Sequence, residues 1–157
     1  MRDKDKLITA MLSIARILFG ITFLFSGFVK AVDPIGFAYK IEDYLISFQL
    51  LWLLPFALAF AIGLIVLELM LGVFVLLGNY RKLSTSLSVM FMAVMMPMTL
   101  YIALKNPVED CGCFGDALVI SNWATFYKNV VLIVLALILL IFHKKIKPLF
   151  SNHTQGY

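Results

Sequence analysis

Four long apolar stretches dominate this 157-residue sequence and leave little choice of fold. A helix that crosses the hydrocarbon core of a bilayer needs about 20 mostly apolar residues. Because 62% of the residues are hydrophobic and only 14% are charged, the chain cannot cover a water-facing surface. We therefore predict an all-α, polytopic membrane protein: an antiparallel bundle of four transmembrane helices. The spans run over about 7–29, 50–77, 83–104 and 123–142, in one domain over residues 1–148, with 149–157 as a disordered cytoplasmic tail.

The distribution of basic residues predicts how the bundle is oriented. Cytoplasmic segments of membrane proteins carry an excess of Lys and Arg. Here the N-terminus, the second connection and the tail hold most of them: Arg2, Lys4, Lys6, Arg81, Lys82, Lys144, Lys145 and Lys147. Both termini are therefore predicted to face the cytoplasm of a bacterial inner (plasma) membrane, with the first and third connections outside. The net charge of +4 then reflects membrane orientation. The bilayer is the expected partner, and nucleic acid is not.

The first outer connection carries the pattern of a short amphipathic helix. Asp33 is a good helix cap, and Pro34 follows it at the first helical position. Apolar residues then recur at spacings of three and four: Ile35, Ala38, Ile41, Leu45 and Phe48. We predict a helix over 34–48 that lies on the outer interface as a lid or spacer.

Three charged residues stand inside the apolar stretches. One of them, Lys128, lies near the start of the fourth stretch, where its side chain can extend to the membrane interface. Arg16 and Glu68 each lie nine residues from the cytoplasmic end of their stretch, a depth of about 13–14 Å. A lone charge at such a depth costs at least about 2.5–3.5 kcal/mol. The sequence therefore predicts an Arg16–Glu68 pair in the bundle interior, either as a structural clamp or as a proton or quinone head-group site.

The only two cysteines, Cys111 and Cys113, lie in the third connection, which the topology places on the oxidising side. Gly112 between them supplies the backbone freedom that a small disulfide ring needs. Strained, exposed disulfides are labile, whereas a short loop gains little stability from a staple. Thiol–disulfide exchange by Cys111 and Cys113 is therefore favoured. The supporting loop residues are Gly112, Phe114, Gly115 and Asp116.

Metal binding is a rival use of the two cysteines. Two thiolates are half of a tetrahedral zinc shell, but His143 and His153 fall on the cytoplasmic side. The methionines of the third stretch could suit copper, yet they point around the helix and are more typical of packing. No metal ligands are therefore assigned, and a metal- or solute-handling bundle stays a third hypothesis.

Several motifs give a family resemblance over about residues 10–143. The first span contains Arg16-x6-Phe23-x2-Ser26-Gly27-x2-Lys30, and the second contains Glu68-x3-Gly72 followed by Gly78 and Arg81. This pattern resembles the DoxX/DoxD superfamily of small four-helix membrane proteins. The third connection and the last span contain Cys111-Gly112-Cys113-Phe114-Gly115, Trp123 and Lys128-Asn129. This block resembles the MauE branch, the methylamine utilisation protein.

The resemblance implies a redox-associated inner-membrane protein that helps to form disulfides in exported partners, together with a thioredoxin-like protein. A role in methylamine metabolism would also require the dehydrogenase as a client. DsbB and vitamin K epoxide reductases are similar only in architecture, since they use Cys-x-x-Cys and a quinone. Here a single Cys-x-Cys is present.

The expected mechanism begins with attack of a partner's thiolate on the Cys111–Cys113 disulfide. Electrons then pass to a quinone near the outer leaflet, for which Trp123 and Phe114 are candidate stacking groups; both aromatics also suit interface anchoring. The alternative is a non-enzymatic subunit that tethers soluble redox proteins to the membrane. An oligomer is compatible with close helix contacts at Gly20, Gly63 and Gly72.

Overall fold

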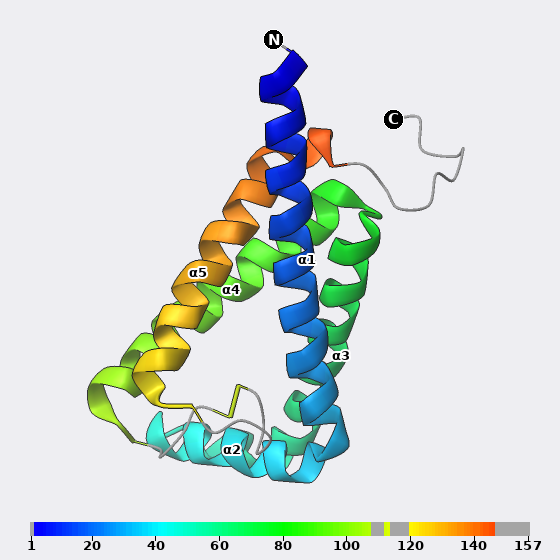
Figure 1. Ribbon diagram of the computed structural model, residues 1–157. Helices are drawn as coiled ribbons and strands as arrows, with labels where there is room; N and C mark the ends of the chain where they lie inside the picture. Colours follow the sequence, from blue (N-terminus) through cyan, green and yellow to red (C-terminus); the bar gives the residue numbers. More distant parts are fainter. Residues whose placement is uncertain (1, 108–111, 114–119, 147–157) are drawn as a thin grey trace.

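The computed structural model (Figure 1) describes residues 2–107, 112–113 and 120–146. Within these ranges the chain is helical and contains no strand. The α-helices are α1 (Arg2–Val32), α2 (Pro34–Ser47), α3 (Ala57–Leu77), α4 (Arg81–Lys105) and α5 (Asn122–Ile141). The 3-10 segment η1 (Leu51–Phe56) lies between α2 and α3, and a second one, η3 (His143–Lys145), follows α5. Four segments are long and apolar enough to cross a membrane: Lys6–Val32, Leu51–Leu77, Arg81–Lys105 and Asn122–Ile141. The predicted fold class is confirmed.

The four long helices form two pairs. α1 packs along α3, and α4 packs along α5. Figure 1 shows the pairs diverging towards one end of the bundle, where α2 lies across the gap. The start of α1, the α3–α4 turn and η3 lie at the opposite end. We call these the α2 end and the basic end, since the latter holds Arg81 and the His143–Lys145 segment.

Helix α2 forms where the cap and the apolar periodicity predict it. The Asp33 carboxylate accepts a hydrogen bond from the Gly36 N–H at 2.8 Å, and Pro34 occupies the first turn. The buried face of α2 is Phe37, Ala38, Ile41, Tyr44 and Leu45. Most of these residues pack against Ala57, Ala61 and Ile65 of α3. The helix is thus part of the packed protein and closes one end of the bundle.

Glycines bring α1 and α3 into close contact. A Cβ atom on Gly20 would approach the Gly72 carbonyl oxygen to 3.2 Å, and one on Gly72 would approach the Leu24 nitrogen to 3.0 Å. A Cβ on Gly27 would meet the Leu69 nitrogen at 3.2 Å. Gly20 and Gly72 therefore serve contacts within the chain. Gly63, by contrast, has nothing within 4 Å of a Cβ position.

The largest apolar core lies between the two helix pairs on the side of the basic end. It includes Phe19 and Phe23, whose rings stack at 4.3 Å between centroids, and Phe91, which meets Phe23 edge-on at 5.5 Å. Ile146, just after η3, is buried in the same cluster. This packing holds the pairs together at one end and leaves them apart at the other.

Candidate functional site

A buried ion pair joins α1 to α3 near the α2 end. The Lys30 ammonium, in the last turn of α1, lies 2.6 Å from Glu68 Oε1, and the two side chains are only 3% and 5% exposed. Lys30 Nζ also lies 4.8 Å from the centre of the Phe37 ring, a cation–π contact. Removing two charges from solvent is costly, so each charge depends on the other.

The predicted Arg16–Glu68 pair is wrong, because Glu68 pairs with Lys30. Arg16 lies ten residues before Ser26 on α1, which is about 15 Å along a helix. Since Gly20 packs at the level of Leu76, Arg16 lies near the α3–α4 turn, well past Glu68. There it lines a small cavity with Thr9, Ser13, Lys145 and Ile146.

Ser26 links the ion pair to the cysteine loop. Its hydroxyl oxygen lies 2.9 Å from Glu68 Oε2 and 2.6 Å from the carbonyl oxygen of Cys113. A serine hydroxyl has one proton to donate, so the carboxylate and the carbonyl compete for it. The backbone at Cys113 is thereby tied to the position of Glu68.

Part of the predicted cysteine site lies within the described residues. Cys113 is disulfide-bonded. Gly112 has a φ of 61°, a left-handed value that favours glycine, and a Cβ there would meet the Lys40 side chain at 3.2 Å. The other predicted site residues of this loop lie outside the described residues: Cys111, Phe114, Gly115 and Asp116.

A second lysine shares the interior with the ion pair. A cavity of about 30 Å³, enough room for a water molecule, is lined by polar groups that include Ser26, Lys30, Glu68, Lys128 and Asn129, and by Cys113. Lys128 interacts electrostatically with both Lys30 and Glu68. We expected Lys128 to extend to the membrane interface, but it faces inwards. Among the described residues lining this cavity, two ammonium groups therefore accompany one carboxylate.

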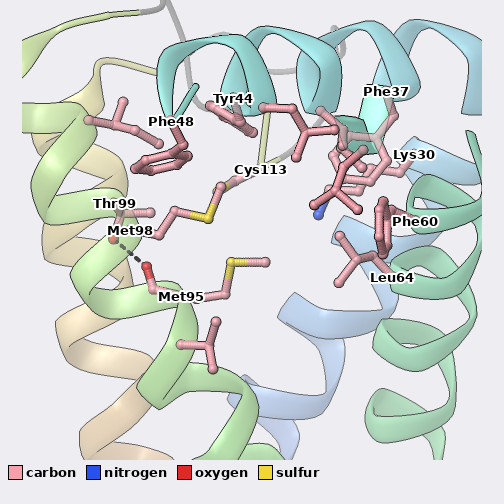
Figure 2. A pocket seen from close by; sticks show the side chains of 15 residues that line it. Lys30, Phe37, Tyr44, Phe48, Phe60, Leu64, Met95, Met98, Thr99 and Cys113 are labelled. Carbon is pink, nitrogen blue, oxygen red and sulfur yellow. Dashed lines mark hydrogen bonds between the residues drawn. The ribbon is translucent and has the colours of Figure 1, made fainter. Parts of the chain in front are cut away.

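A larger, apolar pocket lies on the other side of Cys113. It has a volume of about 340 Å³ and lies between α3 and α4, with α2 closing it at the end of the bundle. Figure 2 shows Met95, Met98 and Thr99 on one wall and Phe60 and Leu64 on the opposite wall. Cys113 packs here with Tyr44, Ile102 and Met98. The cysteine is thus shared by a polar cavity and an apolar pocket.

Trp123 is not among the described residues that line this pocket. Its side chain is 45% exposed, and its ring groups with those of Phe126 and Tyr127 at 6.1 and 6.2 Å. The expected stacking role of Trp123 is therefore not supported, and Phe114 lies outside the described residues. The exposed aromatic group at the start of α5 has the composition of an interface anchor.

The described residues contain no cluster of three or more His, Cys, Asp or Glu side chains that could hold a metal ion. Met95 and Met98 do line the apolar pocket with Cys113. A disulfide-bonded cysteine offers no thiolate, which is the form that binds metals.

The hydroxyl of Ser26 is expected to restrain Cys113. In S26A the Cys113 carbonyl loses the hydrogen bond from Ser26. We therefore expect water-soluble phosphine to reduce the disulfide several-fold faster, as followed by thiol labelling. S13A is the matched control, because the Ser13 hydroxyl bonds only within α1, to the Thr9 carbonyl at 2.9 Å. Equal reduction rates in S26A and the unaltered protein would contradict this role.

Sequence reasoning missed Ser26, Lys30 and Lys128 as site residues. The predicted first span stops at residue 29 and so places Lys30 in a connection. In the structure α1 continues to Val32 and includes Lys30. A signal for these residues was present in the sequence, because all three stand in the motifs that carry the family resemblance.

Comparison with known proteins places the chain in a family. Residues 8–142, most of the chain, match the family described as methylamine utilisation protein MauE. No curated protein and no solved structure matches the chain. The four apolar segments agree with a multi-pass membrane protein. With its ion pair, its cysteine loop and its membrane helices inside the matched region, this chain belongs to the MauE family.

Proposed function

We propose that this protein exchanges disulfides with thiol proteins at the outer face of a bacterial inner membrane. The observation that carries the proposal is the disulfide-bonded Cys113, held by Ser26 at the α2 end of the bundle. The basic end lies opposite, and the excess of Lys and Arg there favours a cytoplasmic location. The α2 end then faces the outside, where disulfides persist.

The reaction uses the Cys111–Cys113 pair as an oxidant. A thiolate of the partner attacks one sulfur, the S–S bond breaks, and the other cysteine leaves as a thiolate. A second thiolate of the partner then resolves the mixed disulfide. The partner gains a disulfide, and the pair takes up two electrons and, after protonation, two protons.

The charge balance around Cys113 supports this chemistry. Lys30 and Lys128 give two positive charges against the single negative charge of Glu68 in the cavity that Cys113 lines. Neighbouring ammonium groups stabilise a thiolate. The excess positive charge would thus favour departure of the cysteine thiolate during exchange.

The family name suggests the physiological setting. MauE denotes methylamine utilisation, so an exported enzyme of that pathway is the proposed client, with a thioredoxin-like protein as the proposed carrier. The bundle would then supply oxidising equivalents at the membrane surface.

A stoichiometric exchange reaction tests the function. The oxidised protein in lipid nanodiscs is mixed with reduced thioredoxin as the probe, and thiols are trapped with a mass-tagged maleimide. We expect one disulfide to pass to thioredoxin per chain, and C113S to abolish the transfer. A thioredoxin that lacks its second, resolving cysteine traps the mixed disulfide with the oxidised protein, and mass spectrometry of the linked peptides identifies the attacked sulfur.

Thioredoxin that binds the nanodiscs but stays reduced would contradict exchange and favour the membrane-anchor alternative. Thiols of Cys111 and Cys113 that remain free in native membranes would also contradict it. A matched protein sample reduced before mixing is the control for adventitious oxidation.

A further inference from the structure

We propose that the apolar pocket beside Cys113 binds the ring of a membrane quinone, with Lys30 donating a hydrogen bond to one quinone oxygen. The quinone would reoxidise the cysteine pair after each exchange. This inference rests on the proposed function and deepens it, because it identifies the class of electron acceptor and its site.

The size and lining of the pocket fit a quinone head group. Its volume of about 340 Å³ lies at the lower end of the roughly 300–1,000 Å³ typical of small-molecule sites. The walls are mostly apolar, with aromatic rings from Phe37, Phe48 and Phe60 and thioethers from Met95 and Met98. Such a surface suits a flat, substituted ring and the first part of its apolar tail.

The pocket is reached from the faces of the protein that contact lipid. Phe60 of α3 and Val94 of α4 line it, and they are 43% and 64% exposed on two helices long enough to span a membrane. In a bilayer these side chains face hydrocarbon, because both stand inside transmembrane segments. A ligand that enters between them is therefore lipid-soluble.

Lys30 distinguishes a quinone from a lipid acyl chain. Its side chain is 3% exposed, and Figure 2 shows its nitrogen directed towards the enclosed space. Glu68 accepts at Oε1 from one of the three N–H groups of the ammonium, which leaves further donor capacity on the pocket side. An acyl chain offers no hydrogen-bond acceptor, so an acyl chain in the pocket would leave the remaining N–H groups of the buried ammonium without a partner there, which is costly. A quinone carbonyl offers one.

The redox step balances with this acceptor. The reduced cysteines lose two electrons and two protons as their S–H bonds break and the S–S bond forms. The quinone takes up the same two electrons and two protons as two O–H bonds form, giving the quinol. Cys113 packs on the pocket wall with Tyr44 and Met98, so donor and acceptor would be neighbours.

A tryptophan at the mouth of the pocket tests the site. Val94 is an exposed position, so V94W should fold, and its indole would narrow the entrance. V131W is the matched control, because Val131 on α5 is 58% exposed and is not among the described residues that line the pocket. The probe is decylubiquinone, titrated into nanodiscs that hold the oxidised protein.

We expect saturable binding of decylubiquinone to the unaltered protein and to V131W, with at least a tenfold loss of affinity in V94W. We also expect decylubiquinone to restore the disulfide of the prereduced protein, more slowly in V94W. Equal binding by V94W and V131W would overturn the proposed site.

The two proposals fail in different ways. A protein that oxidises thioredoxin once but neither binds decylubiquinone nor is reoxidised by it would overturn the quinone site and leave the exchange function standing. A protein that binds decylubiquinone in a V94W-sensitive manner but leaves thioredoxin reduced would support the pocket as a quinone site and overturn the exchange function.

Discussion

Replacing Glu68 with Gln is expected to destabilise the protein by about 3–5 kcal/mol, the usual cost of removing one partner of a buried ion pair. Glu68 accepts from both Lys30 and Ser26 and is the carboxylate of the polar cavity. In E68Q the ammonium of Lys30 stays buried at the end of α1 without its counter-charge. Unfolding in mixed micelles, followed by circular dichroism, measures the loss.

The lysine variant should be milder. K30M still leaves Lys128 within electrostatic reach of Glu68, so one cation and one anion remain in the cavity. E68Q leaves two cations and no anion among the described residues that line it. The expected order of stability is therefore the unaltered protein, then K30M, then E68Q.

The double variant separates charge from packing. K30M/E68Q should be more stable than E68Q alone, because it removes a buried cation that has lost its partner. If K30M proves as damaging as E68Q, Lys128 does not compensate for the loss of Lys30. R16M is the control variant for loss of a charge away from the Lys30–Glu68 pair, since Arg16 lies about 15 Å from Ser26 along α1.

The fold could be predicted because its signals are long and local. Each span reaches the length that a bilayer demands, and the apolar periodicity after Asp33 predicts the end of α2 to within one residue. The packing of α2 against α3 could not be predicted in this way. It depends on which face of α3 is left open by α1, and that is a tertiary property.

The charged site was only partly predictable. Glu68 was recognised because a carboxylate within an apolar stretch is costly. Arg16 was predicted as its partner from equal depths counted from the ends of the two spans. Such a count assumes that antiparallel helices begin and end at the same depth in the membrane. The contacts of Gly20 with Leu76 and of Gly27 with Leu69 set a different register, and this places Lys30 at Glu68.

The apolar pocket has no signature in the sequence. It exists because the two helix pairs diverge towards the α2 end and α2 closes that end, so its lining comes from distant parts of the chain. Met95 and Met98 were interpreted as packing residues. Their partners across the pocket, Phe60 and Leu64, are ordinary members of an apolar span.

Gly72→Val is expected to separate α1 from α3 and to weaken the ion pair together with the fold. A Cβ at Gly72 would meet the Leu24 nitrogen at 3.0 Å and the Gly20 carbonyl oxygen at 3.1 Å. These are backbone atoms, so a rotamer change cannot relieve the clash and the helices must move apart. Overpacking of this kind costs about 1–3 kcal/mol, and membrane helices rely on such close approach for their association.

The displacement should reach the Lys30–Glu68 pair, because Gly72 is one turn from Glu68 on α3. The separation of 2.6 Å between Lys30 Nζ and Glu68 Oε1 depends on the spacing of α1 and α3. We expect G72V to lower the unfolding free energy and to speed phosphine reduction of the disulfide, since Ser26 bridges Glu68 and Cys113. G63V is the matched control on the same helix, where a Cβ meets nothing within 4 Å. Equal stability of G72V and G63V would mean that the α1–α3 contact tolerates a larger spacing between the helices. The position of the Lys30 ammonium would then be set by its contact with the Phe37 ring.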